Sequence, residues 1–275
     1  MPEGPEIWRV AQRLHAALGG RRLTAIFFGL PSLAGCEARF TDARVEWVAS
    51  RGKALLTAFD NGLTIYSHNQ LYGRWELLEA GQPPPETRRQ LRLALHTDCA
   101  SALLYSASEI EVLDAGALER HPFLSRLGPD LLAPDTSLAR LRERLRSPTF
   151  ARRRLGGLLS DQSFVAGIGN YLRCEILFSA GLHPARAPRT LDDEALERLV
   201  AAMLELPRQS AASGGVTNPL ARYEALRHAG ADFETARFQV FRRAGLPCYR
   251  CGATVLRLPS GGQPCYLCPA CQPAP

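Results

Sequence analysis

The hydrophobic pattern changes its period along the chain, from helical spacing to short runs and back to helical spacing. Residues 6–18 place apolar side chains at helical spacing, and Gly19-Gly20 follow as a stop. From about residue 21 to 114 the apolar residues fall instead in short runs: LTAIFF, ARVEWVAS, KALLTAF, LTIYSH, QLRLAL, ALLYSA and EIEVL. One helix followed by many short strands predicts antiparallel sheets packed as a sandwich.

Helical character returns in the second half of the chain. Residues 128–135 (GPDLLAPD) predict an interdomain linker because they combine a glycine with two prolines. Amphipathic helices are expected over 137–145 and 191–206, and residues 158–181 predict a helix, a Gly-Ile-Gly-Asn turn and a second helix. The stretch 211–220 (AASGGVTNPL) is rich in glycine and predicts a mobile loop.

The order of these patterns predicts an α+β fold. A chain of 275 residues is too long for one small unit and suits two or three. We expect an N-terminal two-sheet β-sandwich with flanking helices over residues 1–128. A helical domain over 129–236 and a cysteine-rich C-terminal unit over 237–275 should follow.

Composition narrows the class of protein. Hydrophobic residues at 46% and charged residues at 22% are ordinary globular values and exclude wholesale disorder. The net charge of +6 makes polyanions plausible partners. No apolar run approaches the ~18–20 residues that a membrane span needs, and the start lacks the pattern of a secretory signal. These features predict a cytoplasmic protein without a membrane partner.

Two cysteine pairs near the C-terminus have the spacing of a zinc ribbon. Cys248-x2-Cys251 is followed after 16 residues by Cys268-x2-Cys271. Four thiolates leave no open coordination position, so one structural zinc ion is expected, and two disulfides are the alternative. Cys265 is expected at a packed hairpin position rather than as a ligand. Because so short a tail has almost no core, the metal should hold it folded.

Residues 167–170 (Gly-Ile-Gly-Asn) open a predicted helix. The N-terminus of a helix presents free N–H groups, so this turn is a candidate phosphate seat with Asn170 as the cap. The preceding stretch is rich in arginine, from Arg140 to Arg154, which favours a basic groove. An ordinary helix cap and a solvated helix face are the alternatives.

Five motifs occur in an order that resembles a known family. They are MPEGPEI at 1–7, RGKALL at 51–56, YSHNQLYGRW at 66–75, GIGNYLRCEIL at 167–177 and CPACQ at 268–272. Together they resemble the formamidopyrimidine-DNA glycosylase and endonuclease VIII family of DNA repair enzymes. YSHNQLYG, LLYSAS and HPFL resemble the endonuclease VIII branch. The resemblance runs from end to end and implies a helix–two-turns–helix unit before the zinc ribbon.

The resemblance implies catalytic roles for Pro2, Glu3 and Lys53. Removal of Met1 would expose Pro2 as a secondary amine, and α-amino groups titrate near ~7.7–8.0, so part of it is nucleophilic at neutral pH. Glu3 would be the general acid and base. Lys53, the single lysine beside 32 arginines, would contact phosphate and carry a proton. A rigid turn before a helix and a surface lysine are the alternatives.

Gln70, Leu71 and Tyr72 offer a polar, an apolar and an aromatic side chain on one turn. An enzyme that acts on a base must swing it out of the duplex, and these side chains suit a wedge that fills the gap, with Gln70 pairing with the orphaned base. A core strand end is the alternative. Glu6 and Glu175 match acids near the active site of the family, and each could equally be a helix-cap or helix-surface carboxylate.

The sequence departs from the family at one DNA contact. Asn170 matches the family's phosphate contact, but residues 260–264 (SGGQP) carry Gln263 where the family has an arginine. Compared with arginine, glutamine still donates a hydrogen bond, but it lacks the positive charge and the paired N–H groups that bind a phosphate at two points. We therefore expect weaker binding of the damaged backbone than in the family.

The resemblance implies a DNA glycosylase with abasic-site lyase activity on damaged double-stranded DNA, and we expect a monomer. The endonuclease VIII resemblance implies oxidised pyrimidines as substrates, a Schiff base on Pro2 and β,δ-elimination. The alternatives are a purine-lesion glycosylase of the formamidopyrimidine branch and a non-catalytic binder of damaged DNA.

Overall fold

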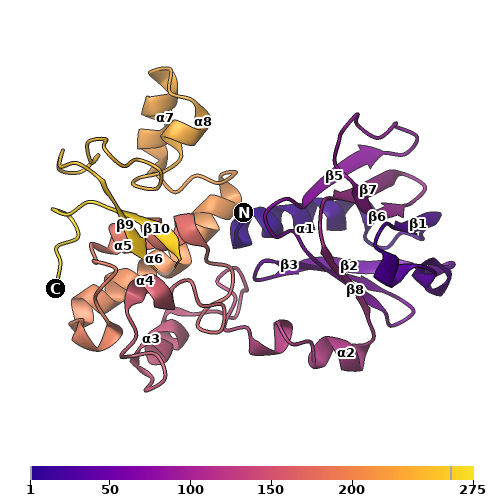
Figure 1. Ribbon diagram of the computed structural model, residues 1–275, viewed down its shortest axis with the longest axis horizontal. Coiled ribbons are helices and arrows are strands. Elements are labelled where there is room, and N and C mark those ends of the chain that lie inside the picture. Colours follow the sequence, from indigo (N-terminus) through magenta and orange to yellow (C-terminus); the bar gives the residue numbers. More distant parts are fainter. Residues whose placement is uncertain (1, 261) are drawn as a thin grey trace. The chain divides into compact units, whose positions relative to one another are not determined.

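The computed structural model describes residues 2–260 and 262–275. Met1, whose removal the proposed chemistry needs, and Gly261 of the SGGQP stretch lie outside the described residues. The chain divides into two compact units, Met1–Arg126 and Leu127–Pro275. Figure 1 shows two layers of strands with one long helix in the first unit, and helices with a single hairpin in the second. Within the described ranges, no helix is long and apolar enough to span a membrane.

The first helix, α1 (Gly4–Leu18), begins two residues before the predicted one and ends where predicted. Pro5 lies in its first turn, where the missing N–H costs nothing, and Gly19 follows its last residue. Its apolar stripe, which includes Ile7, Leu14 and Leu18, is buried against the second sheet of the unit.

Two four-stranded antiparallel sheets form the first unit, with strand orders β1-β6-β7-β5 and β2-β3-β4-β8. This confirms the predicted sandwich. The strands are β1 (Ala25–Phe28), β2 (Val45–Arg51), β3 (Ala54–Phe59), β4 (Thr64–His68), β5 (Arg74–Glu79), β6 (Leu91–His96), β7 (Ala100–Tyr105) and β8 (Glu109–Leu113). Short helices η1 (Pro31–Leu33), η2 (Cys36–Phe40), α2 (Ala115–Glu119) and η3 (Leu124–Arg126) complete the unit.

Strand β5 was not predicted from the sequence. Its residues, RWELLE, carry three charges and lie at the edge of their sheet, where one side of the backbone pairs with β7. Trp75 is the position in this strand that is buried in the core between the sheets. An edge strand tolerates charges that a central strand such as β3, buried at every position, does not.

The second unit is built around the buried helix α5 (Asn170–Ala180). Nine of its eleven residues are buried, and α6 (Asp193–Ala212) packs along it. The remaining elements are α3 (Leu138–Arg146), α4 (Leu155–Leu158), η4 (Pro188–Thr190), α7 (Leu220–His228), α8 (Phe233–Ala236), β9 (Leu256–Ser260) and β10 (Gln263–Leu267). The helices predicted over 137–145 and 191–206 are confirmed, and α6 continues past its internal Pro207.

The helix predicted at the start of 158–181 is displaced. The structure has only the four-residue α4, which ends where that segment begins. Asp161 then turns the chain, because its Oδ1 accepts hydrogen bonds from the N–H and the hydroxyl of Ser163, at 2.8 and 2.7 Å. Such local bonds compete with helix formation.

The expected linker at 128–135 is wrong. The N–H of Gly128 donates to the carbonyl oxygen of Gln162 at 2.9 Å, and Leu131 is buried in the core of the second unit. A Cβ at Gly128 would lie 2.3 Å from the carbonyl oxygen of Phe164, so the glycine allows a close approach of two backbones. The glycine and the prolines of 128–135 therefore belong to a turn packed in the second unit and not to a flexible linker.

The mobile loop expected at 211–220 is also wrong. Its first residues extend α6, and Val216, Thr217 and Asn218 are buried. The Gln209 amide donates to the carbonyl oxygens of Val216 and Asn218, at 3.2 and 2.8 Å. The glycines supply positive φ angles, 78° at Gly214 and 112° at Gly215, that a compact turn needs.

The C-terminal hairpin of β9 and β10 packs on α5 (Figure 1). Its apolar residues share one cluster with Cys174 and Phe178 of that helix. Cys265 is 1% exposed and its Sγ lies 3.9 Å from Sγ of Cys174, which confirms the packed hairpin position. The hairpin therefore has a core that it shares with α5.

Candidate active site and metal centre

The first residues of the chain form a tightly capped helix start. Glu3 is the N-cap of α1 and is 4% exposed. Its backbone N–H donates to Oε2 of Glu6 at 3.0 Å, and its own carboxylate accepts the N–H of Glu6, which makes a capping box. The helix-cap alternative for Glu6 is therefore confirmed. The box fixes the backbone beside Pro2 and holds the Glu3 carboxylate in place.

Lys53 lies in the tight turn between β2 and β3, as expected. The strands pair up to Arg51 and Ala54, and Gly52 takes the left-handed conformation with φ of 62°. Burial lowers the pKa of the Lys53 amine, and the nearby Glu3 carboxylate opposes this shift. The turn thus brings Lys53 close to Glu3. A lysine whose pKa is lowered exchanges protons more readily near neutral pH.

His68 joins this group, and the sequence analysis missed it. It ends β4 directly opposite Ala54, and its pKa is lowered by burial, with Lys53 adding to the shift and Glu109 opposing it. Its Nδ1 accepts the backbone N–H of Gln70 at 3.1 Å, so the proton of the neutral ring lies on Nε2. The signal was present, because His68 stands inside the YSHNQLYG motif.

Gln70, Leu71 and Tyr72 form the turn between β4 and β5. Leu71 is 58% and Tyr72 69% exposed, so the alternative of a core strand end is wrong. Gln70 has a φ of 49°, and the carbonyl oxygen of Tyr72 accepts a bond from Arg89 at 2.6 Å. Two large apolar side chains exposed side by side have no use in the fold and suit insertion into a partner.

In the second unit, Asn170 is the first residue of α5. Gly169 is the N-cap, so Asn170 is not the cap that was expected. The side-chain amide oxygen Oδ1 of Asn170 accepts a bond from the guanidinium of Arg173, one turn further along the helix. Its position at the helix N-terminus remains that of a candidate phosphate contact.

Arg173 connects the start of α5 to the C-terminal hairpin. It is 1% exposed, although a free arginine is almost never buried. Its guanidinium donates to backbone carbonyl oxygens of Gly156, Ser260, Gln263 and Pro264, at 3.1 to 3.3 Å. Sequence reasoning missed Arg173, since an arginine inside an apolar helix gives no sign of which carbonyl groups it will meet.

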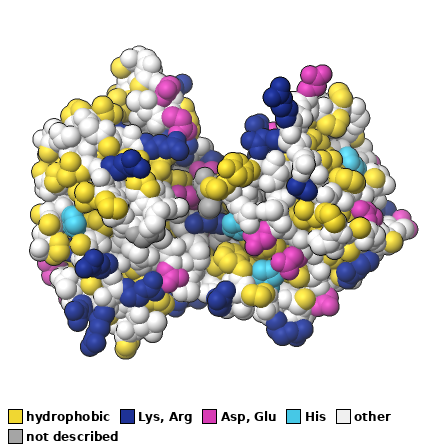
Figure 2. Space-filling view, viewed as in Figure 1, with side chains coloured by type: hydrophobic (Ala, Val, Ile, Leu, Met, Phe, Trp, Pro, Cys, Tyr) yellow, Lys and Arg dark blue, Asp and Glu magenta, His cyan; other side chains and the backbone are white. Residues whose placement is uncertain are grey.

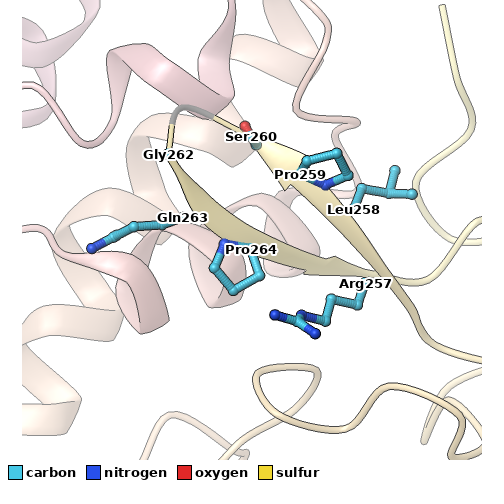
Figure 3. Close-up of a pocket in the computed structure, with 7 residues that line it drawn as sticks. All are labelled: Arg257, Leu258, Pro259, Ser260, Gly262, Gln263 and Pro264. Atoms are coloured by element: carbon cyan, nitrogen blue, oxygen red, sulfur yellow. The ribbon is translucent and has the colours of Figure 1, made fainter.

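Gln263 is exposed at the beginning of β10, beside the hairpin turn. Figure 3 shows it extending from the hairpin away from Arg257, which agrees with a register that pairs Gln263 with Ser260 and Arg257 with Tyr266. The hairpin strands line a shallow pocket of about 420 Å³. Through Arg173, the backbone of Gln263 is tied to Asn170.

The basic groove expected from the arginine-rich stretch before α5 stays a prediction, because Arg152 and Arg154 are exposed while the other arginines are engaged within the protein. Four of its seven arginines pair with acids and Arg144 donates to two carbonyl oxygens, and Figure 2 shows basic and acidic side chains intermingled on the visible surface. The ion pairs are Arg140–Asp135, Arg142–Glu197, Arg146–Asp193 and Arg153–Asp161. The alternative of a solvated helix face describes these arginines.

Glu175 is fully buried in α5, so the helix-surface alternative is wrong. Its carboxylate accepts four hydrogen bonds, each 2.8 or 2.9 Å long, from the hydroxyl of Thr217 and the N–H groups of Gln239, Val240 and Phe241. Burial raises the pKa of Glu175, and these bonds oppose the shift. The carboxylate braces the chain that leads into the C-terminal hairpin.

The four predicted cysteine ligands meet in one cluster. Their Sγ atoms all lie within 4.8 Å of one another, and the Cys251–Cys268 and Cys248–Cys271 pairs are 3.4 and 3.9 Å apart. Zinc–sulfur bonds of about 2.3 Å in a tetrahedron place sulfurs about 3.8 Å apart, so the cluster can hold a metal ion. These separations also exceed a disulfide bond, so the disulfide alternative is wrong.

Comparison with known proteins decides the family. Residues 1–109 match the formamidopyrimidine-DNA glycosylase N-terminal domain and residues 127–219 its H2TH domain. Endonuclease 8 of Escherichia coli (strain UMN026) is 46% identical over 272 residues, which cover 99% of this chain and 100% of the relative. Endonuclease 8 of Shigella sonnei shows the same identity and coverage. The chain belongs to the formamidopyrimidine-DNA glycosylase and endonuclease VIII family.

Solved structures of this family share the fold. Lactococcus lactis Fpg in complex with abasic-site DNA has a TM-score of 0.80 at 22% identity, over 99% of this chain and 100% of that one. MutM in complex with carbocyclic 8-oxo-G DNA has a TM-score of 0.79 at 21% identity, with the same coverage. Members of the family are DNA glycosylases and lyases, so the chain is a base-excision-repair enzyme. The higher identity to Endonuclease 8 places it in the endonuclease VIII branch.

Proposed function

We propose that this enzyme excises oxidised pyrimidines from double-stranded DNA and cleaves the abasic site through a Schiff base on Pro2. The observation that carries this proposal is the first turn of α1, where Pro2 precedes the buried Glu3 and Lys53 lies close by with a lowered pKa. After loss of Met1, the Pro2 nitrogen would form a bond to the sugar C1′ as the bond from C1′ to the base breaks.

A secondary amine suits this chemistry because the iminium that it forms carries a fixed positive charge. That charge acidifies the neighbouring sugar carbon, so β-elimination and then δ-elimination remove the sugar and leave a one-nucleotide gap. Glu3 would move protons to and from the sugar ring. Lys53 would contact the adjacent phosphate and donate a proton to the departing site.

Damaged double-stranded DNA is the proposed partner. The identity to Endonuclease 8 and the DNA complexes of the fold relatives support this choice. Leu71 and Tyr72, exposed on their turn, would enter the base stack as a wedge while Gln70 pairs with the orphaned base. Asn170 and Gln263 would contact backbone phosphates. We further propose a monomeric, cytoplasmic enzyme in which residues 129–236 and 237–275 act as helical domain and ribbon.

The lesion class is tested by single-turnover excision on a panel of duplexes. We expect dihydrouracil and thymine glycol to be excised faster than 8-oxoguanine. Faster excision of 8-oxoguanine would favour the purine-lesion alternative instead. Tight binding of every lesion without excision or strand cleavage would favour a non-catalytic binder.

Replacement of Gln263 by arginine should tighten binding to lesion-containing duplex. A hydrogen bond to a charged group contributes about 1.5–3 kcal/mol, so we expect about a tenfold or larger gain in affinity. The slope of the logarithm of the binding constant against the logarithm of the salt concentration should also steepen by about one, because one more counterion is released. Both are measured by fluorescence anisotropy at several salt concentrations.

The matched control is Gln12→Arg, which adds the same charge at an exposed position on α1. It should change affinity much less. Equal gains from both variants would mean that Gln263 makes no specific phosphate contact.

We propose that Cys248, Cys251, Cys268 and Cys271 hold one structural zinc ion. The ion would carry no step of the reaction. Its role would be to fix the turns at the base of the hairpin, whose other end carries Gln263. The N–H groups of Arg250 and Cys271, at 3.4 Å from Sγ of Cys248 and Cys268, would stabilise the bound thiolates.

Loss of one ligand should remove the metal and weaken DNA binding. We expect one zinc per chain by elemental analysis, none in Cys251→Ser, and at least ~tenfold weaker binding because the hairpin loses its anchor. The control is Cys265→Ala, which removes a buried thiol of the same hairpin outside the cluster and should keep its zinc. A zinc-free Cys265→Ala, or a Cys251→Ser that keeps zinc, would contradict the assignment.

A further inference from the structure

The Gln70 side chain is held by two residues at the start of a neighbouring strand, Ser108 just before it and Glu109 as its first residue. Its Nε2 donates to Oε2 of Glu109 at 3.3 Å, and its Oε1 accepts the hydroxyl of Ser108 at 2.6 Å. This strand is β8, which pairs with β4 so that Glu109 lies opposite His68. The sheet register therefore places both residues beside the β4–β5 turn.

These two contacts fix the orientation of the Gln70 amide. An ionised carboxylate can only accept hydrogen bonds, so the NH2 group must face Glu109 and the oxygen must face Ser108. A flipped amide would place its oxygen against the carboxylate and its NH2 group against the hydroxyl. The Ser108 hydroxyl could accept from the flipped NH2 group, but the flip would lose the bond to Glu109 and set two oxygens against each other.

The backbone of the turn is held as well. Gln70 adopts a φ of 49°, and its N–H donates to His68. The N–H of Gly73 donates to the carbonyl oxygen of Asn69 at 2.7 Å, and a Cβ at Gly73 would lie 2.6 Å from that oxygen. Neither the backbone of Gln70 nor the amide at the tip of its side chain can therefore move without breaking hydrogen bonds.

A locked amide still has pairing capacity. A primary amide carries two hydrogens and two oxygen lone pairs, and each contact uses one of these. One donor and one acceptor remain, in a fixed order. Adenine and cytosine present a donor followed by an acceptor on their pairing edges, whereas guanine and thymine present the reverse order. A fixed amide fits one of these two pairs of bases better than the other.

We propose that Ser108 and Glu109 are positioning residues that lock the Gln70 amide and so set which bases the enzyme accepts opposite the lesion. This inference rests on the proposed function, in which Gln70 pairs with the orphaned base. Without the lock the amide turns freely and meets both edge types equally. Discrimination between adenine or cytosine and guanine or thymine then disappears.

The test is single-turnover excision of dihydrouracil placed opposite dA, dC, dG or dT by the zinc-loaded full chain. The wild type should divide the four duplexes into the pairs dA/dC and dG/dT. Ser108→Ala and Glu109→Ala should each reduce the ratio between the pairs by roughly three- to tenfold, the effect of losing one ordinary hydrogen bond. Ser108→Thr keeps the hydroxyl and should preserve the ratio, whereas Glu109→Gln brings an amide that can also donate and should lose part of it.

Cleavage of a single-stranded abasic site separates positioning from general damage to the fold, since no orphaned base exists there. Both Ser108 variants should cleave it at the wild-type rate. A wild type with equal rates opposite all four bases, or alanine variants that keep the ratio, would overturn the inference while excision itself remains. Absence of excision opposite every base would overturn the proposed function and this inference with it.

Discussion

Borohydride should trap a covalent adduct between this enzyme and abasic-site DNA, and the adduct should be largely lost in Pro2→Gly. Reduction of the iminium that joins the Pro2 nitrogen to C1′ gives a stable amine, visible as a slower band on a denaturing gel. Glycine leaves a primary amine, which forms an imine that can shed its proton and hydrolyse. We expect a loss of ~100-fold or more in trapping rate, within the range for covalent and proton-transfer catalysis.

The environment of Pro2 makes this test specific. The capping box of Glu3 and Glu6 holds the backbone beside Pro2, so the position of its nitrogen depends on α1 rather than on a free tail. Replacing Pro5, which lies in the first turn of the same helix, by alanine changes a proline without touching the nucleophile. Pro5→Ala should therefore trap DNA at close to the wild-type rate.

Two further samples sharpen the test of Pro2. A chain that retains Met1 has no free proline nitrogen and should give no adduct through Pro2, which mass spectrometry of the trapped peptide can confirm. An adduct mapped to Lys53 or to another amine would contradict the assignment of the nucleophile. Full trapping by Pro2→Gly would contradict the need for a secondary amine.

The elements that could be predicted are those that a local pattern specifies. A short stretch of sequence is enough to predict each of these elements. They are the apolar stripe of α1, the buried strands β3 and β4, and the two Cys-x2-Cys pairs. The placement of Lys53 in a turn also follows from the strands that flank it. Such signals depend little on the rest of the chain.

The features that could not be predicted depend on partners far away in sequence. The sequence of 211–220 predicts a loop. In the structure Gln209 donates to two of its carbonyl oxygens and Glu175 accepts its Thr217 hydroxyl, which allows the stretch to be buried. The sequence alone predicts Arg173 as a surface charge. In the structure it is surrounded by backbone carbonyl groups, some of them about ninety residues later in the chain. Glycine-rich segments and arginine side chains are expected at the surface on local grounds. They can be buried here because distant segments of the fold supply hydrogen-bond partners for their polar groups.

Lys53→Arg should keep DNA binding and lose most of the activity. Arginine preserves the charge that contacts phosphate, but its guanidinium does not give up a proton in proteins. Loss of a positioned proton donor costs about 10²- to 10⁴-fold, so we expect single-turnover excision to fall by at least ~100-fold while the affinity for lesion duplex changes little. Excision rate and affinity are measured on the same dihydrouracil duplex.

The pH profile gives a second reading of the same residue. Burial lowers the pKa of Lys53, and the protonated amine is the form that donates. The wild-type rate should therefore fall on the alkaline side, as the pH rises through this lowered pKa. The residual rate of Lys53→Arg should lack that alkaline fall, because the guanidinium stays protonated throughout.

Arg51 provides the matched control two positions earlier. It is exposed at the end of β2, so Arg51→Lys makes the reverse exchange of cations on the same turn without removing the proposed proton donor. It should excise at nearly the wild-type rate. The 32 arginines show that this chain tolerates guanidinium groups almost everywhere, so a cost confined to Lys53 would mark the position that requires an amine. Near-normal turnover by Lys53→Arg, with an unchanged alkaline fall, would return Lys53 to an ordinary phosphate contact.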